Sequence, residues 1–475
     1  MKVLWLCNVA LPMIAGQFGL ESSNKEGWLS GLAHALLEGR RENDIRLSVA
    51  FPMPGKGGGK NQEICAKEVQ TPKGALIDCY GFCEDVANAE VYDMALQARM
   101  RKIIEMAKPD IVHCFGTEYA HTLAMCRVFP KKERILVGIQ GICTLYAESY
   151  FADLPGEVLD SVTFRDRVRK DTLRRQQEKF AIRGEREREA LGLAGNITGR
   201  TEWDRAFGEE CNPHARYYPM NETLRREFYG PVWEEGGCIP HSVFVSQGDY
   251  PLKGLHYMLL AMPAILAGYP DAKVFVAGNS LVEYGTWKQK LKISAYGKYL
   301  RRLLDQNGLH DKVVFLGRLD AGQMLDRYLQ SSLYVCCSAL ENSPNSLGEA
   351  MLLGMPCVSA DVGGISSIFT DGRDGILYKG FSAQGVDGAR AAGCEGETFR
   401  RGRPQDRGQE ASGRGQAEAC GLEAVAGRLA DAVVEMWENP EKRREYCANA
   451  RKHAMETHHQ DRNYHRLLEV YRDMA

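Results

Sequence analysis

The residues best suited to chemistry lie in one stretch, 333–364 (LYVCCSALENSPNSLGEAMLLGMPCVSADVGG). The pattern predicts a buried strand ending near residue 337, a polar loop, and a short helix over 347–353 that Gly354 ends. The first N–H groups of such a helix are unpaired, and the helix dipole favours an anion beside them. In open parallel sheets, ligands bind beyond the carboxyl ends of the strands, where this loop is expected. The stretch therefore predicts a phosphate-binding site.

Two carboxylates, Glu341 and Glu349, lie on either side of the helix start with seven residues between them. One is expected in the loop and the other in the first helical turn, so both can face one ligand. Carboxylates accept hydrogen bonds from paired hydroxyls, which makes a sugar or a ribose a natural partner. The structural alternative is a capping box over 346–349 (SLGE), in which Glu349 would only satisfy a backbone N–H.

The surroundings of these carboxylates resemble the donor-site signature of glycosyltransferase family 4, the retaining group 1 transferases. In that signature a Glu-x7-Glu element precedes a Gly-x-Pro turn and a Gly-Gly loop, and here Gly354-Met355-Pro356 and Gly363-Gly364 follow in order. The resemblance implies that Glu341 contacts the sugar of the donor and Glu349 the ribose. The donor-binding residues that it implies around these two carboxylates are Asn345, Ser346, Leu347 and Gly364.

A second block, 243–255 (VFVSQGDYPLKGL), resembles the diphosphate-binding segment of the same family. The family usually has an arginine after the first strand of this domain and a lysine six residues later. Lys253 occupies the lysine position, and the resemblance implies that it stabilises the leaving diphosphate; a solvated loop lysine is the alternative. Gln247 stands in place of the arginine. Losing one such donor costs on the order of a hundredfold in rate, unless a nearby arginine substitutes.

The first half of the chain resembles the family more loosely. Gly27 would belong to a glycine-rich first turn near the donor phosphate. The segment 108–113 (KPDIVH) matches a family strand, and His113 is a candidate catalytic residue, with a satisfied strand-end histidine as the alternative. Gln140 stands where the family often has a histidine near the reacting sugar. Arg200 is a candidate for binding an anionic donor or replacing the missing arginine.

Short apolar strands alternate with longer helical stretches in both halves, which predicts an α/β fold with parallel sheets covered by helices. The resemblance implies the GT-B architecture, two Rossmann-like doubly wound domains facing across a cleft. The expected acceptor domain is 1–235, completed by a C-terminal crossing helix at about 456–475. The expected donor domain is 240–455. The predicted strands are 2–7, 45–50, 111–114, 135–139, 193–197, 242–245, 273–277, 312–316, 333–337, 357–359 and 376–378.

Three further segments stand out. The segment 52–61 (PMPGKGGGKN) is predicted to be a loop, since its spacing does not fit a phosphate-binding loop. The segment 382–420 has few large apolar residues and is predicted to be a flexible insertion. The segment 164–190 contains ten cations among six carboxylates. We interpret it as a solvated helix with charge pairs; the alternative is a basic face resting on an anionic membrane.

The bulk composition excludes several classes of protein. Hydrophobic residues make up 44% and charged residues 26%, and the formal net charge of -2 argues against a nucleic-acid partner. Fifteen scattered cysteines fit free thiols in a reducing cytosol better than a disulfide framework. We also expect no secretory leader, no membrane span and no resident metal. A cytoplasmic location, with peripheral contact at the inner membrane face, is therefore expected.

These patterns and the resemblance together predict a retaining, metal-independent glycosyltransferase of glycan, glycolipid or cell-surface polysaccharide synthesis. It would use a nucleotide-sugar co-substrate, a UDP- or GDP-sugar, and a carbohydrate or lipid-linked acceptor, without a cofactor. The alternatives of the same fold are a nucleotide-sugar epimerase and a phosphorylase. Because of Gln247 and Gln140, a catalytically weak sugar-nucleotide-binding subunit is a further alternative.

Overall fold

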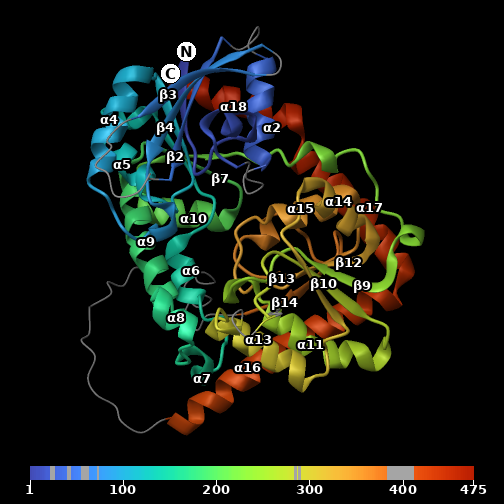
Figure 1. The fold of residues 1–475 in the computed structure, drawn as a ribbon. Helices are drawn as coiled ribbons and strands as arrows, with labels where there is room; N and C mark the ends of the chain where they lie inside the picture. The colour runs from blue at the N-terminus through green and yellow to red at the C-terminus, as the bar shows by residue number, and fades with distance from the viewer. Residues whose placement is uncertain are drawn as a thin grey trace.

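The computed structural model describes residues 1–475 apart from 22–26, 40–43, 55–63, 72–73, 283–285, 287–289 and 382–410. The chain forms two α/β domains, one around each of two sheets (Figure 1). In the part of the chain that the structure describes, no helix is both long and apolar enough to cross a membrane.

The first sheet has eight strands in the order β3-β4-β2-β1-β5-β6-β7-β8. Neighbouring strands are parallel, except that β3 runs antiparallel to β4 at one edge. The strand order reverses direction between β1 and β5, which creates the topological switch point where open sheets bind ligands. The strands are β1 (Lys2–Leu6), β2 (Arg46–Met53), β3 (Cys65–Gln70), β4 (Leu76–Cys83), β5 (Ile111–Phe115), β6 (Ile135–Gly138), β7 (Asn196–Gly199) and β8 (Arg216–Pro219).

Helices cover both faces of this sheet, and each face has its own apolar core. The helices of the first half are α1 (Pro12–Ala15), α2 (Gly27–Glu38), α4 (Ala95–Ala107), α5 (Ala120–Val128), α6 (Cys143–Ser149), α7 (Gly156–Leu159), α8 (Phe164–Arg169), α9 (Leu173–Leu193) and α10 (Glu202–Cys211). The last helix, α18 (Gln460–Met474), crosses back and completes one of these cores. Its Tyr471 accepts a 2.8 Å hydrogen bond from the indole N–H of Trp5 on β1.

The second sheet has six parallel strands in the order β11-β10-β9-β12-β13-β14. They are β9 (Ile239–Val245), β10 (Lys273–Ala277), β11 (Val313–Gly317), β12 (Ser331–Cys336), β13 (Cys357–Asp361) and β14 (Ile376–Lys379). Its helices are α11 (Leu255–Gly268), α13 (Ala295–Gln306), α14 (Ala321–Gln330), α15 (Asn345–Leu353), α16 (Ala411–Glu438) and α17 (Pro440–Thr457). The connection between the domains runs through η4 (Arg226–Phe228).

Several local predictions were incomplete or wrong. β3, β4 and β8 were not predicted. β3 and β8 are partly exposed edge strands without a continuous apolar run, whereas Asp78 and Gly81 interrupt the apolar run of the mostly buried β4. The strand predicted over 193–197 begins only at Asn196, because Leu193 ends α9 and Ala194 is the C-cap of that helix. The predicted insertion over 382–420 lies outside the described residues as far as 410, and α16 begins at Ala411. Of the loop predicted over 52–61, residues 52–53 belong to β2, and 55–61 lie outside the described residues.

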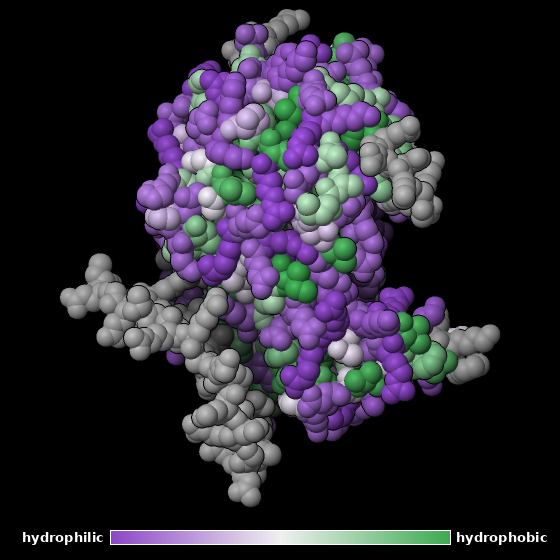
Figure 2. All heavy atoms as spheres, turned by 90° about the vertical axis from the view of Figure 1, so that its left-hand side faces the viewer, coloured by the Kyte–Doolittle hydropathy of each residue, from purple (hydrophilic) through white to green (hydrophobic). Residues whose placement is uncertain are grey.

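The charged segment over 164–190 forms two helices, α8 and α9, separated at Lys170, whose φ is 52°. Its cations pair mostly with other segments rather than along the helix; Arg174, for example, contacts Asp160 at 2.6 Å. The face that carries α4, α5, α8 and α9 is mostly hydrophilic, with hydrophobic residues in small groups (Figure 2). Among the described cysteines, thirteen are free thiols.

Candidate active site

Glu341 lies in the loop between β12 and α15, at the carboxyl edge of the second sheet. Its side chain is buried, and its Oε1 accepts hydrogen bonds from Lys253 Nζ at 2.6 Å and from Ser338 Oγ at 2.8 Å. Lys253 comes from the turn after β9, so two crossover loops of the sheet meet at this ion pair. The structure therefore brings together the two residues that the sequence predicted to act on the donor.

The position of Lys253 depends on the glycine that follows it. Gly254 has a φ of +68°, and a Cβ at this position would overlap the backbone oxygen of Cys337. The turn can therefore lie directly on the end of β12 only because residue 254 is glycine. Burial tends to lower the pKa of Lys253, but the Glu341 carboxylate more than offsets this and holds the pKa well above its usual value. Lys253 is therefore a cation at neutral pH.

The Gly363-Gly364 turn supports the same loop from behind. Gly363 has a φ of +57°, and a Cβ there would overlap the backbone oxygen of Glu341; a Cβ at Gly364 would overlap that of Asn342. The Gly364 N–H donates to the Glu341 carbonyl at 3.0 Å. These glycines set the backbone position of Glu341, and the backbone N–H of Gly364 contacts the loop between β12 and α15, here called the donor loop.

Helix α15 begins at Asn345, with Pro344 as its N-cap and no capping side chain. The N–H groups of Leu347 and Gly348 already donate to the Pro344 carbonyl. Among the predicted donor-binding residues of this helix, Asn345 and Ser346 are therefore the ones whose N–H groups can bind a phosphate. The capping box considered for 346–349 does not form. The Ser346 hydroxyl accepts instead from Tyr334 at 2.8 Å, while the Leu347 side chain is buried in the core.

Glu349 has a different partner from Glu341. Both of its carboxylate oxygens accept from the guanidinium of Arg225, each at 2.6 Å. Arg225 lies in the connection between the two domains and was not predicted. Burial raises the pKa of Glu349, and Arg225 opposes that rise. A ribose that reaches Glu349 must therefore share this carboxylate with Arg225.

Two cavities adjoin these groups. One of about 40 Å³ is lined by Lys253, Glu341 and Ser346, with Gln247 in its wall. The other, of about 690 Å³, lies between α2 and the connection over 223–227, with Arg225 in its wall. Gln247 thus lies where the resemblance expects an arginine beside the diphosphate, and its amide supplies no positive charge there.

Arg200 does not line the small cavity beside Lys253. Its guanidinium forms an ion pair with Glu222 and donates to the backbone and side-chain oxygens of Gln140 at 3.1 and 3.3 Å. Both partners belong to the first domain. Arg200 also lines a cavity of about 20 Å³ with His113 and Gln140, and its role toward the donor stays a prediction.

His113 is fully buried on β5 rather than exposed to the interdomain space. Its Nδ1 lies 2.8 Å from the Tyr471 hydroxyl of α18, and its ring stacks on Phe115. Burial lowers the pKa of His113 to about 3, so the ring is neutral. Its Nε2 has no hydrogen-bond partner among the described residues and borders a cavity of about 20 Å³ that Gln140 and Arg200 also line. The ring is therefore bonded on one side only, and its catalytic role stays a prediction. Gly27 opens α2, and its surroundings lie outside the described residues.

The first domain contacts the donor loop directly. Asn342 is buried, and its amide donates to the Gln140 carbonyl at 3.1 Å and to Asp204 Oδ2 at 3.0 Å. Its side-chain oxygen accepts from the Thr201 hydroxyl at 2.7 Å. These contacts were not predicted; the only sequence signal was the capping box from Thr201 to Asp204 that opens α10.

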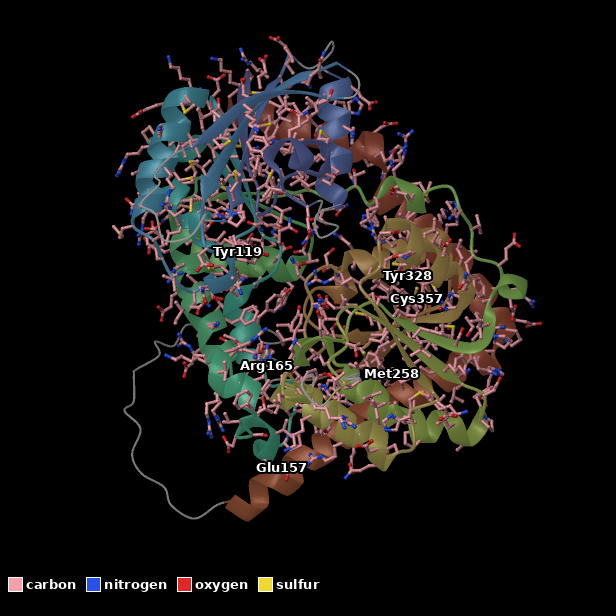
Figure 3. All side chains as sticks on the ribbon, viewed as in Figure 1. Tyr119, Glu157, Arg165, Met258, Tyr328 and Cys357 are labelled. Carbon is pink, nitrogen blue, oxygen red and sulfur yellow. The ribbon has the colours of Figure 1, made fainter. Side chains whose placement is uncertain are left out.

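A second contact between the domains joins α11 to the segment that follows α6. His256 of α11 bonds the Ala152 carbonyl at 2.9 Å, and Tyr257 donates to Asp153 at 3.2 Å. Figure 3 shows Tyr328, Met258 and Cys357 in the second domain, and Tyr119 and Arg165 in the first.

No group of three or more His, Cys, Asp or Glu residues in the described chain is placed to hold a metal ion.

Residues 241–389 match the family model described as glycosyl transferases group 1. The second domain is similar to the group 1 glycosyl transferases. An uncharacterised glycosyltransferase of Methanocaldococcus jannaschii is 31% identical over 134 residues, which cover 28% of this chain and 30% of the relative. Spore coat protein SA of Bacillus subtilis is 25% identical over 169 residues, 35% of this chain and 42% of the relative. The chain thus matches less than half the length of these curated relatives.

Solved structures match the whole chain. A sucrose-phosphate synthase from Thermosynechococcus elongatus superposes with a TM-score of 0.63 at 13% identity, covering 100% of this chain and 99% of that one. The Anabaena protein HepE, solved in complex with UDP-glucose, superposes with a TM-score of 0.60 at 13% identity, covering 100% of both chains. At this identity the likeness concerns the fold. It confirms the GT-B fold of two α/β domains.

Proposed function

We propose that this protein is a retaining glycosyltransferase of family 4 that moves a sugar from a nucleotide diphosphate to an acceptor hydroxyl. The observation that carries the proposal is the Lys253–Glu341 ion pair at the carboxyl edge of the second sheet, beside the uncapped start of α15. The group 1 family match over 241–389 includes both residues.

In the proposed reaction, the bond between the anomeric carbon and the β-phosphate oxygen breaks. The acceptor hydroxyl oxygen attacks the anomeric carbon from the same face, and its proton passes to the departing phosphate oxygen, so the configuration is retained. Lys253 and the Asn345 and Ser346 N–H groups stabilise the charge that develops on the diphosphate. Glu341 orients the transferred sugar through its hydroxyls. No step calls for a metal ion or another cofactor.

We place the nucleoside in the larger cavity, whose wall contains Arg225. Glu349 does not line this cavity, so it would reach the ribose beside Arg225, to which it is bound. A uridine nucleotide is the first donor to test, because the HepE structures contain UDP and UDP-glucose. A GDP-sugar is the second. The acceptor would be a carbohydrate or a lipid-linked carbohydrate.

The test is release of nucleoside diphosphate from a panel of UDP- and GDP-sugars, followed by determination of the anomeric configuration of the product. Lys253→Ala is expected to lower kcat by about a hundredfold or more, because it removes the cation at the leaving group. A full rate in both Lys253→Ala and Glu341→Ala would contradict this site. An inverted product would contradict retention.

Gln247 favours one alternative, a sugar-nucleotide-binding subunit with weak catalysis. In that case a donor would bind the wild-type protein with ordinary affinity, but no UDP- or GDP-sugar of the panel would release diphosphate. Gln247→Arg tests this directly, since it restores a cation at the wall of the Lys253 cavity. A gain of about tenfold or more in kcat would show that the missing charge limits the rate.

We further propose that the protein works in the cytoplasm and contacts the inner membrane face through α8. Val162, Phe164 and Val168 are 49%, 62% and 65% exposed there, beside Arg167 and Arg169. Exposed apolar side chains next to cations suit an anionic lipid surface. Sedimentation with phosphatidylglycerol vesicles should fall in Phe164→Ser/Val168→Ser and at high salt. Equal binding to phosphatidylcholine vesicles would contradict the proposal.

A further inference from the structure

A cavity of about 280 Å³ opens on the first domain between the turn after β4 and helix α9. The segment η2 (Val86–Asn88) forms part of one wall, and residues 176–183 of α9 form part of the other. Tyr119, which follows β5, and Tyr150, which follows α6, complete the lining. Because β4 and β5 run in the same direction, the cavity lies at the carboxyl edge of the first sheet. This is the edge where open sheets bind ligands.

Three aromatic side chains, Tyr119, Tyr150 and Phe180, line this cavity. The rings of Tyr150 and Phe180 are 5.4 Å apart and tilted by 36°. The Arg183 guanidinium lies 4.7 Å from the Phe180 ring and 5.7 Å from the Tyr119 ring, which holds the two aromatic residues together. Aromatic surface with polar groups at its rim suits a sugar ring, whose C–H faces are apolar and whose hydroxyls donate and accept hydrogen bonds.

The charged residues of the cavity are two cations and two carboxylates, and they are bound to protein groups. Lys179 Nζ lies 3.3 Å from Glu90 and 3.7 Å from Asp171. Arg183 Nε donates to the Glu118 carbonyl at 2.8 Å. A phosphate or carboxylate ligand would have to compete with these partners, whereas an uncharged ligand leaves them in place. The balance of charge therefore favours a neutral ligand.

Aromatic residues connect this cavity to the donor groups of the second domain. Tyr146 of α6 packs edge-on against Phe180, with ring centroids 6.0 Å apart. Tyr150 of the cavity wall belongs to the apolar core cluster of the second domain, and Tyr146, Phe180 and Tyr250 pack against the same cluster. The Tyr250 ring centroid lies 5.7 Å from Lys253 Nζ. The cavity thus lies next to the second-domain groups that the donor would contact.

We propose that this cavity is the acceptor subsite, and that it takes an uncharged sugar unit of a glycan or glycoside. The Tyr119 and Phe180 rings would receive the apolar face of the sugar. The Tyr150 hydroxyl donates to the Gln176 side-chain oxygen, and both oxygens can still accept hydrogen bonds from sugar hydroxyl groups without breaking that bond. A hydroxyl at the inner end would then point toward Lys253 and Glu341. This inference rests on the proposed function, because it supplies the second substrate of that reaction.

A binding experiment tests the cavity without turnover. Saturation-transfer NMR is recorded with methyl α- and β-hexopyranosides, and with glucuronic acid and glucose 1-phosphate as anionic probes. We expect transfer to a neutral glycoside in the wild type, and its loss in Phe180→Ala and in Tyr119→Ala. The matched control is Tyr269→Ala, which truncates a partly buried ring that packs 5.0 Å from Trp437, outside the cavity lining. It should bind like the wild type.

A kinetic experiment follows, with the donor that the diphosphate assay identifies. Phe180→Ala should raise the KM of a neutral acceptor by about tenfold, with the donor KM and acceptor-independent hydrolysis unchanged. Tyr119→Ala provides the same test if Phe180→Ala does not fold. The proposal would be overturned if only anionic acceptors accelerated the release of diphosphate. It would also be overturned if the glycoside still bound in both Phe180→Ala and Tyr119→Ala. Absence of diphosphate release would contradict the proposed function, while the NMR result would still decide the cavity.

Discussion

The Thr201 hydroxyl donates a 2.7 Å hydrogen bond to the side-chain oxygen of Asn342, across the boundary between the two domains. Asn342 directly follows Glu341, and its amide donates to Asp204 and to the Gln140 carbonyl. Every polar atom of this buried side chain is therefore bound by the first domain. Asn342 thus ties the position of Glu341 to the first domain.

Asn342→Asp should separate the domains at this contact. The substitution places a carboxylate beside the Asp204 carboxylate and removes the amide donor, in a buried position where both changes are costly. We expect a lower thermal midpoint, a larger radius of gyration by X-ray scattering, and a kcat lower by about a hundredfold, because Glu341 is displaced. Asn88→Asp is the matched control, since the exposed Asn88 amide also donates to an aspartate, Asp85, at 2.7 Å. Unchanged scattering and kcat in Asn342→Asp would exclude this role.

Gly363→Ala should affect catalysis more than folding. A Cβ at this position overlaps the Glu341 carbonyl, so the donor loop must shift. We expect kcat to fall by about a hundredfold, as measured by diphosphate release. Gly372→Ala separates this effect from backbone strain alone, because Gly372 has a similar φ of +66° with open space around it. If both variants lose the same activity, the cause is the backbone strain of alanine at a positive φ, and not the overlap with the Glu341 carbonyl.

The ion pair between Arg225 and Glu349 should be needed for stability as well as for donor binding. Arg225→Ala leaves a buried carboxylate without its partner, and we expect a loss of about 3–5 kcal/mol in the free energy of unfolding. Arg225→Met/Glu349→Met removes both charges and should recover most of that loss in denaturant titrations. The double variant should nevertheless bind a UDP-sugar more weakly than the wild type. Normal donor affinity in it would show that Glu349 does not contact the ribose.

His256 should make the contact between α11 and the first domain sensitive to acid. Burial lowers the pKa of His256 to about 4, below the usual value of about 6.5 that it has in the unfolded chain. The unfolded state therefore binds more protons between these values, so stability is complete above pH 6.5 and falls as the pH approaches 4. At pH 5 the loss is about 2 kcal/mol from this residue.

The comparison of wild type with His256→Gln checks this pH dependence. Urea unfolding at pH 7.5 and pH 5.0 gives the stability loss of each protein on acidification. The variant keeps a side-chain amide that can donate to the Ala152 carbonyl, but it has no group that titrates in this range. Its loss should therefore be smaller than that of the wild type. An equal loss in both proteins would mean that His256 titrates normally.

Most strands of the parallel sheets were predictable, because strands buried on both faces appear as short apolar runs between helices. β12 and β13 are examples, and the glycines that end α15 and form the 363–364 turn were equally visible. β3 was not predicted, because its exposed residues at an antiparallel edge carry no such run. In the same way, Lys253 and Glu341 were recognisable because each lies in a short block of the second domain that resembles a family signature.

The sequence by itself determined the two α/β domains and the separate donor-site blocks, since apolar periodicity and glycine turns act over a few residues. Only the tertiary structure decided which blocks meet. Contacts between residues far apart in the chain leave no local pattern, so the Arg225–Glu349 and Thr201–Asn342 pairs could not be predicted. For the same reason, the sequence could not show that Tyr471 of α18 would bind the ring of His113 on β5.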